Sequence, residues 1–232
     1  MANERNFSVN AFPLVVLVVS AAFVLTRFGW YAALNSAIPL VIALLWLAVL
    51  ALAAWGAGDV LCRRWFGPDE PVIERTALQL LTGTAVLAAA AGLLAVARIL
   101  SPVTLLVVVG AFCCHGALRV YRQPPRLNTE TPPARHWGWL IIGIAGGVSL
   151  AAATTFAPFY DQWHYHLGFP YQWLRTGSLV TFERQAYSFF PSNMGLLYLY
   201  ALAGPGAWAA QVMHWWMGAL TAAGSASIAR RL

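Results

Sequence analysis

The stretch AIPLVIALLWLAVLALAAW, residues 37–55, decides the fold class, because its nineteen residues include no charged or amide side chain. A helix of this length spans the roughly 30 Å hydrocarbon core of a bilayer. The rest of the chain has the same character, since 60% of its 232 residues are hydrophobic and only 9% are charged. One soluble core could not bury so many apolar side chains. The sequence therefore predicts an all-α, polytopic transmembrane helical bundle.

Further apolar runs have the length of a membrane span, which gives about six spans in all. Besides residues 37–55, the predicted spans are 10–28, 76–97, 103–118, 137–157 and 207–228. The apolar run 195–203 is too short to cross before the break Gly204–Pro205–Gly206, so we expect a short helix in the membrane interface there. On the last span, Gln211 and His214 lie three residues apart, which favours hydrogen bonding across helices.

An arginine- and proline-rich segment marks the best candidate for an internal boundary. Residues 119–135 hold four arginines and the pairs Pro124–Pro125 and Pro132–Pro133, a composition that resists regular structure. We therefore predict a four-span module at 1–118 and a cytoplasmic linker at 119–136. The second unit is then 137–232, with two spans and an outer loop at 158–206.

The arginines also predict the topology. All fourteen basic residues are arginine, and with the N-terminus inside, ten fall in inner connections and four in outer ones. Positive charge collects on the cytoplasmic side of membrane proteins, so both termini are predicted to be cytoplasmic in an inner (plasma) membrane protein. Because the arginines lie between apolar runs and not on one soluble face, the net charge of +6 does not indicate nucleic-acid binding.

The loop PFYDQWHYHLGFPYQWLRTGSLVTFERQAYSFFPSNM, residues 158–194, is the candidate for the chemistry. Eleven of its 37 residues are Phe, Tyr or Trp, and it also holds carboxylates and imidazoles. Amphipathic rings settle at the headgroup level of a bilayer. The composition therefore predicts a loop that lies on the membrane surface.

Asp161 stands where the fifth predicted span leaves the membrane. A carboxylate at this depth is costly to dehydrate, so it needs a partner or a function. The structural alternative is a helix cap, or an ion pair with Arg175 or Arg184. We favour function, because aromatic and imidazole side chains surround Asp161 in the sequence.

His164 and His166 are two residues apart, which places both on one side of an extended segment. We favour hydrogen bonding to a substrate or phosphate over plain packing. A divalent metal would need Asp161 or Glu183 as further ligands, with the loop folded back, and the spacing matches no established metal motif. No metal ligand is therefore assigned and no cofactor is certain, although a divalent metal stays an alternative.

Two further groups in the loop have both a functional and a structural interpretation. Glu183 and Arg184 either contact an anionic ligand or form a solvated ion pair, and nothing nearby in the sequence separates the two. The turn Pro191–Ser192–Asn193 predicts a cap for a helix that starts near Met194, since Ser and Asn accept hydrogen bonds from helix N–H groups. Asn193 is kept as a candidate substrate contact.

The pattern D-x-x-x-Y-H-L at 161–167, followed by F-P-S-N-M at 190–194, resembles bacterial GT-C-fold glycosyltransferases. The resemblance covers about residues 137–232. Members of that family are polytopic enzymes that transfer a sugar from a polyprenyl-phosphate carrier on the outer face of the membrane. Their first outer loop carries an Asp close to the membrane and lies on the surface as amphipathic helices.

The resemblance implies that Asp161 is the catalytic or acceptor-positioning carboxylate, with Tyr165 and His166 beside it as substrate contacts. It also implies a polyprenyl-phosphate-linked sugar and membrane lipid as partners. Two departures matter: Gln162 stands where many members carry a second acid, and members continue through further spans. We therefore expect activity to need downstream spans or a partner membrane subunit. The alternative function is a non-catalytic membrane subunit that binds lipid or a partner.

Overall fold

The computed structural model describes residues 8–63, 72–122, 136–153, 166–181 and 192–229. Within these ranges all regular structure is helical, which confirms the all-α prediction. The helices are α1 (Ser8–Cys62), α2 (Val72–Val96), α3 (Pro102–Arg122), α4 (His136–Ala153), α5 (Gly168–Thr176), α6 (Asn193–Ala203) and α7 (Ala207–Ala229).

Three of the helical segments are long and apolar enough to cross a membrane. They are Ala37–Cys62, Glu74–Val96 and Pro102–Arg122. The chain is therefore a helical, multi-pass membrane protein. Of the other predicted spans, 10–28 lies within α1 and 207–228 within α7, while α4 covers 137–153 of the span 137–157, whose last four residues lie outside the described ranges. Their crossing stays a prediction.

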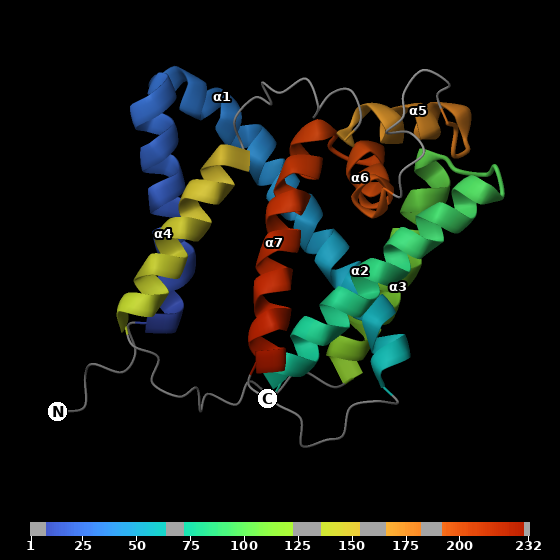
Figure 1. Cartoon of the computed structure of the whole chain (residues 1–232), viewed down its shortest axis with the longest axis horizontal. Coiled ribbons are helices and arrows are strands. Elements are labelled where there is room, and N and C mark those ends of the chain that lie inside the picture. The colour runs from blue at the N-terminus through green and yellow to red at the C-terminus, as the bar shows by residue number, and fades with distance from the viewer. Residues whose placement is uncertain (1–7, 64–71, 123–135, 154–165, 182–191, 230–232) are drawn as a thin grey trace.

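Helix α1 turns back on itself: Figure 1 shows it rising, bending over and descending through the molecule. We predicted two spans, 10–28 and 37–55, with a connection between them, but the connection is itself helical. Gly29 and Pro39 weaken a helix in this region, because glycine is flexible and proline lacks an N–H and crowds the preceding turn. We call the part of α1 before Gly29 the first limb and the part after Pro39 the second limb.

The two limbs of α1 have different neighbours. The first limb packs against α4, where the Ser20 hydroxyl donates to the carbonyl oxygen of Gly147 over 2.8 Å. The second limb contacts α2 and α3, and α7 packs against α1, α2 and α4. The Trp215 ring N–H on α7 donates to the carbonyl oxygen of Gly146 on α4 over 3.1 Å. The predicted division into units at 119–136 stays a prediction, with α3 continuing four residues into that range.

The helix ends form two levels in Figure 1. At the lower end α1 begins and ends, α2 and α4 begin, and α3 and α7 end. At the upper end lie the bend of α1, the turn between α2 and α3, the end of α4, helix α5 and the start of α7. The helix ends next to the predicted inner connections thus lie at the lower end, and those next to the predicted outer connections lie at the upper end. Which end faces the cytoplasm stays a prediction.

That orientation can be measured with single cysteines in a background lacking Cys62, Cys113 and Cys114. Ser178 follows α5 at the upper end, and residue 128 lies in the predicted cytoplasmic linker. In intact cells we expect an impermeant thiol reagent to label Ser178→Cys and to leave Asn128→Cys unlabelled, because the arginine bias puts the linker inside. Lysed cells provide the control, in which both positions should react. Labelling of position 128 alone in intact cells would reverse the topology.

Glycines let α1, α2 and α3 approach closely. A Cβ added at Gly83 on α2 would run into the carbonyl of Ala54 on α1. A Cβ added at Gly56 on α1 would lie 3.2 Å from Cα of Gly116 on α3. Membrane helices associate through small residues of this kind, because lipid offers no hydrophobic drive for them to pair.

Gly83→Ala is expected to lower the free energy of unfolding by about 1–3 kcal/mol, because the added methyl group must push two helix backbones apart. Gly110→Ala is the matched control, since a Cβ added there on α3 meets nothing within 4 Å. Thermal unfolding in detergent compares the two. Equal melting temperatures for the two variants would show that the α1–α2 crossing tolerates a larger separation.

Candidate functional site

The described residues include the flanks of the predicted site but not its carboxylate. Asp161, His164, Tyr165, Glu183 and Arg184 lie outside the described residues. His166 lies just before α5 and is exposed, and Asn193 is the exposed first residue of α6. The roles predicted for these residues stay predictions, and the helices α5 and α6 set the frame in which they would act.

Helix α5 is amphipathic, as expected for an outer loop that lies on a surface. Phe169 and Trp173 are buried on one side, while Tyr171 and Arg175 are exposed. The Trp173 ring N–H donates to the carbonyl oxygen of Val180 over 3.0 Å, which ties the helix to the segment that follows it.

The end of α5 is fixed to the turn between α2 and α3. Gly177 ends the helix at φ 70°, a left-handed conformation that glycine adopts without cost. Its carbonyl oxygen accepts a hydrogen bond of 3.2 Å from the N–H of Leu100. Two residues before Leu100, Arg98 has φ 58° and is exposed at the upper end. A left-handed residue other than glycine costs roughly 1–2 kcal/mol, so the surrounding contacts must hold this turn.

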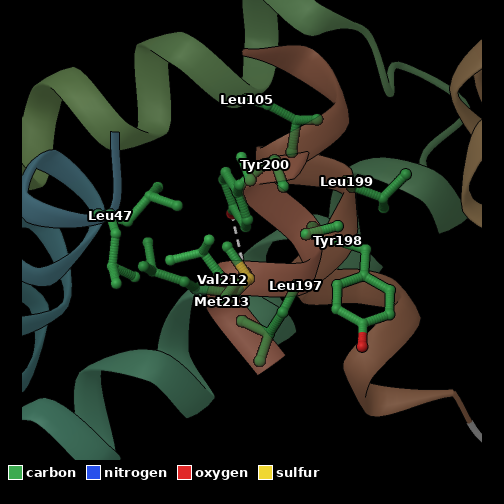
Figure 2. Close-up of a cluster of buried hydrophobic side chains, with 14 of the residues drawn as sticks. Leu47, Leu105, Leu197, Tyr198, Leu199, Tyr200, Val212 and Met213 are labelled. Atoms are coloured by element: carbon green, nitrogen blue, oxygen red, sulfur yellow. Dashed lines mark hydrogen bonds between the residues drawn. The ribbon is translucent and has the colours of Figure 1, made fainter. Parts of the chain in front are cut away.

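Helix α6 packs into the core of the bundle, and its predicted position in the membrane interface stays a prediction. The Tyr200 side chain is 1% exposed, and its hydroxyl donates to the carbonyl oxygen of Leu87 over 2.8 Å. The Trp46 ring N–H donates to the carbonyl oxygen of Tyr200 over 3.1 Å. Figure 2 shows Leu197 and Tyr200 of α6 in one cluster with Val212 of α7. A helix that is apolar on every side, as NMGLLYLYALA is, is buried by its neighbours.

The start of α6 is capped as the sequence predicted. The Ser192 hydroxyl accepts a hydrogen bond of 3.2 Å from the N–H of Gly195. A Cβ added at Gly195 would lie 3.2 Å from the ring of Trp173, so α5 and α6 pack together at this point. His166, just before α5, and Asn193, the first residue of α6, thus lie at the starts of two helices that pack together in the upper part of the bundle. We call this pair of helices the α5–α6 unit.

A hydrogen bond also joins α6 to α7. The Tyr198 hydroxyl and His214 Nδ1 are 2.7 Å apart. This confirms the cross-helix bond predicted for His214. When the phenol donates, a neutral ring carries its proton on Nε2, and that N–H is then available to a ligand or lipid because His214 is exposed on α7.

A second cluster of polar groups lies at the lower end, around a buried carboxylate. Asp59 on α1 is 1% exposed, and its Oδ1 accepts a hydrogen bond of 3.2 Å from the Gln79 side chain on α2. Its Oδ2 lies 3.2 Å from Arg63 Nε, 3.4 Å from Arg119 Nε and 3.5 Å from His115 Nε2. We call these five residues the Asp59 cluster.

The Asp59 cluster joins three helices, and glycine makes this possible. A Cβ added at Gly58 would run into the backbone of Gln79, so α1 and α2 are close enough there for the two side chains to meet. An isolated buried carboxylate costs several kcal/mol, which the surrounding cations must offset.

The predicted spans 37–55 and 76–97 leave residues 56–75 between them as a polar connection, and this hides the cluster. In the structure, α1 continues to Cys62 and α2 begins at Val72. The available signal was the i,i+4 spacing of Asp59 and Arg63 at the end of an apolar run. The contributions of α2 and α3 come from residues at least twenty positions away, and no local pattern indicates them.

The outer loop offers four potential metal ligands in its sequence, Asp161, His164, His166 and Glu183. Within the described ranges, no group of three His, Cys, Asp or Glu side chains is placed to hold a metal ion. Of the four ligands considered, Asp161, His164 and Glu183 lie outside those ranges. A divalent metal in the loop therefore stays a prediction.

Comparison with protein-family models, curated proteins and solved structures finds no match to this chain. The described residues show a helical membrane protein with three candidate spans, shorter apolar helices and the Asp59 cluster. Any assignment of activity rests on the residues themselves.

Proposed function

We propose that this chain acts in glycosyl transfer from a polyprenyl-phosphate-linked sugar to an acceptor outside the cytoplasm. The observation that supports this most is the α5–α6 unit. Helix α5 begins directly after the D-x-x-x-Y-H-L pattern ends at Leu167, and α6 begins with the last two residues of F-P-S-N-M. The two helices pack together where Trp173 meets Gly195. Sequence segments more than twenty residues apart are therefore brought to one part of the upper end.

In the proposed reaction Asp161 is the general base. It takes the proton of the acceptor hydroxyl as that oxygen attacks the anomeric carbon of the sugar, and the bond from this carbon to the phosphate oxygen breaks. The polyprenyl phosphate leaves with its negative charge. Tyr165, His164 and His166 would hydrogen-bond the sugar or phosphate, and Asn193 would contact the substrate from the start of α6.

Cationic groups would stabilise the leaving phosphate. Among the described residues, Arg98 and Arg175 are exposed at the upper end, at the two segments joined by the bond from Leu100 to Gly177. Their guanidinium groups suit phosphate, because a planar fork of N–H donors matches two of its oxygens. Glu183 and Arg184 are proposed to complete the polar surface of the loop.

The test is sugar transfer by native membranes, with the chain present together with its natural membrane partners. The donor is the polyprenyl-phosphate-linked sugar pool extracted from the same cells, and the readout is radiolabelled sugar in the acceptor. Deleting the chain should abolish that transfer, and returning it should restore it. Transfer that is unchanged by the deletion would refute the proposed function. Transfer that needs the chain but not Asp161 would favour the non-catalytic subunit.

A further inference from the structure

The Asp59 cluster has more positive than negative charge. Asp59 provides one carboxylate, and both Arg63 and Arg119 direct a guanidinium to it. Arginine stays protonated in proteins, so the cluster has a surplus of one positive charge even when His115 is neutral. Counted over these described residues, the cluster has one positive charge that a further anion can balance.

The arginines also have hydrogen-bonding capacity to spare. Each approaches Asp59 Oδ2 through Nε alone, and this oxygen accepts no hydrogen bond within the described part of the chain. A guanidinium has five N–H donors, four of them on its two Nη atoms. Within the described part of the chain, both arginines pair with Asp59 through Nε, so the Nη donors can be offered to a ligand. Attachment to one shared oxygen holds the two guanidiniums near each other.

The position of the cluster matches the headgroup level of a bilayer. Arg63 follows the last residue of the candidate span Ala37–Cys62, and Arg119 lies in the last turn of the span Pro102–Arg122. The side chain of Arg63 is 48% exposed and that of Arg119 is 18% exposed. Both can therefore be reached from outside the bundle, while their anchor, Asp59, cannot.

Exposed apolar side chains lie next to the two arginines in the sequence. Val60 and Leu61 on α1 and Leu118 and Val120 on α3 are all exposed. At the end of a membrane span such side chains contact acyl chains. A ligand that joins an anionic phosphate to acyl chains fits this surface better than a free, fully hydrated phosphate does.

We propose that Arg63 and Arg119 bind the phosphate of an anionic phospholipid at the lower end of the bundle. Charged pockets between helices are known to recognise anionic headgroups, and arginine forks bind phosphate through two oxygens. This site lies at the opposite end from the α5–α6 unit and does not depend on glycosyl transfer. With the predicted topology, the lipid belongs to the cytoplasmic leaflet.

The experiment titrates the purified 232-residue chain in detergent with phosphatidylglycerol and counts bound lipid by native mass spectrometry. We expect Arg119→Gln to weaken binding about five- to tenfold, in line with the loss of one arginine near an anionic headgroup. Arg122→Gln is the matched control, because Arg122 is exposed in the same last turn of α3 and is not part of the cluster. It should stay within about twofold of the parent.

Further arms separate the other outcomes. Phosphatidylcholine should bind far more weakly, and inorganic phosphate at millimolar concentration should not displace phosphatidylglycerol. Equal losses for Arg119→Gln and Arg122→Gln, equal binding of both lipids, or full displacement by inorganic phosphate would each overturn the proposal. If Arg119→Gln does not fold, the double variant Asp59→Asn/Arg119→Gln is measured in its place, because it also removes the buried carboxylate. The same loss of lipid binding is expected.

Discussion

Asp161→Asn is expected to lower sugar transfer about 100-fold or more, with the amount of membrane-inserted protein unchanged. The substitution keeps the shape of the side chain and removes its ability to accept a proton. Loss of a general base typically costs roughly 10²–10⁴ in rate, whereas loss of a surface ion pair costs only about 0–1 kcal/mol of stability. A base and a structural carboxylate therefore give results that differ by far more than the error of the assay.

The measurement is transfer by membranes that hold the chain and its natural partners, normalised to inserted protein. Asp69→Asn is the matched control, because Asp69 lies in a predicted inner connection and the same charge is removed there. Activity of Asp161→Asn within about threefold of the parent, against a predicted loss of at least ~10², would make the carboxylate structural. The base would then have to be sought elsewhere, and Glu183 is the one other acid in the sequence of the outer loop.

The double variant Arg63→Gln/Arg119→Gln is expected to lose about 3–5 kcal/mol of stability, the cost typical of leaving a buried charge without its partner. Asp59 would keep only the Gln79 amide and His115 as neighbours. Adding Asp59→Asn removes the charge and should restore most of the loss. Thermal or denaturant unfolding in detergent gives these energies.

The control for this pair removes two arginines elsewhere. Arg98→Gln/Arg175→Gln changes the net charge by the same amount at the upper end, where both side chains are exposed. Its stability should stay close to that of the parent, because exposed charges contribute little. If Asp59→Asn gives no rescue, or if both double variants lose equal stability, the Asp59 cluster does not stabilise the fold through its carboxylate.

The helices could be predicted from sequence because crossing a membrane is a local demand. A run of about twenty apolar residues suffices, whatever the rest of the chain does. The predicted spans 10–28, 37–55, 103–118 and 207–228 accordingly fall within helices, α2 ends one residue before the span 76–97 does, and α4 covers 137–153 of the span 137–157. The same argument could not show that the connection 29–36 stays helical, because a hydropathy pattern records where apolar residues are and not how a polar turn is shaped.

Burial and long-range pairing were the features that sequence could not provide. The length of the run 195–203 predicts a short helix, but it does not show that Tyr200 is buried among the neighbouring helices of the bundle. From sequence, Asp59 was predicted to lie in a connection. Its partners on α2 and α3 are far away along the chain, and they come close where glycines let the helices approach one another. For the outer loop, sequence supplied the candidate residues, and the structure adds how α5 and α6 are held together.

The helical bend of α1 bears on how the chain enters the membrane during synthesis. In an irregular loop, each peptide group carried across the bilayer would lose its hydrogen bonds to water. Where the connection is helical, those groups already bond to one another. If both limbs cross as predicted, they can insert as a preformed hairpin. The translocation machinery then has to carry over only a short turn whose peptide groups already hydrogen-bond to one another. The first two spans would then be in place before α2, α3 and α4 emerge from the ribosome to pack against them.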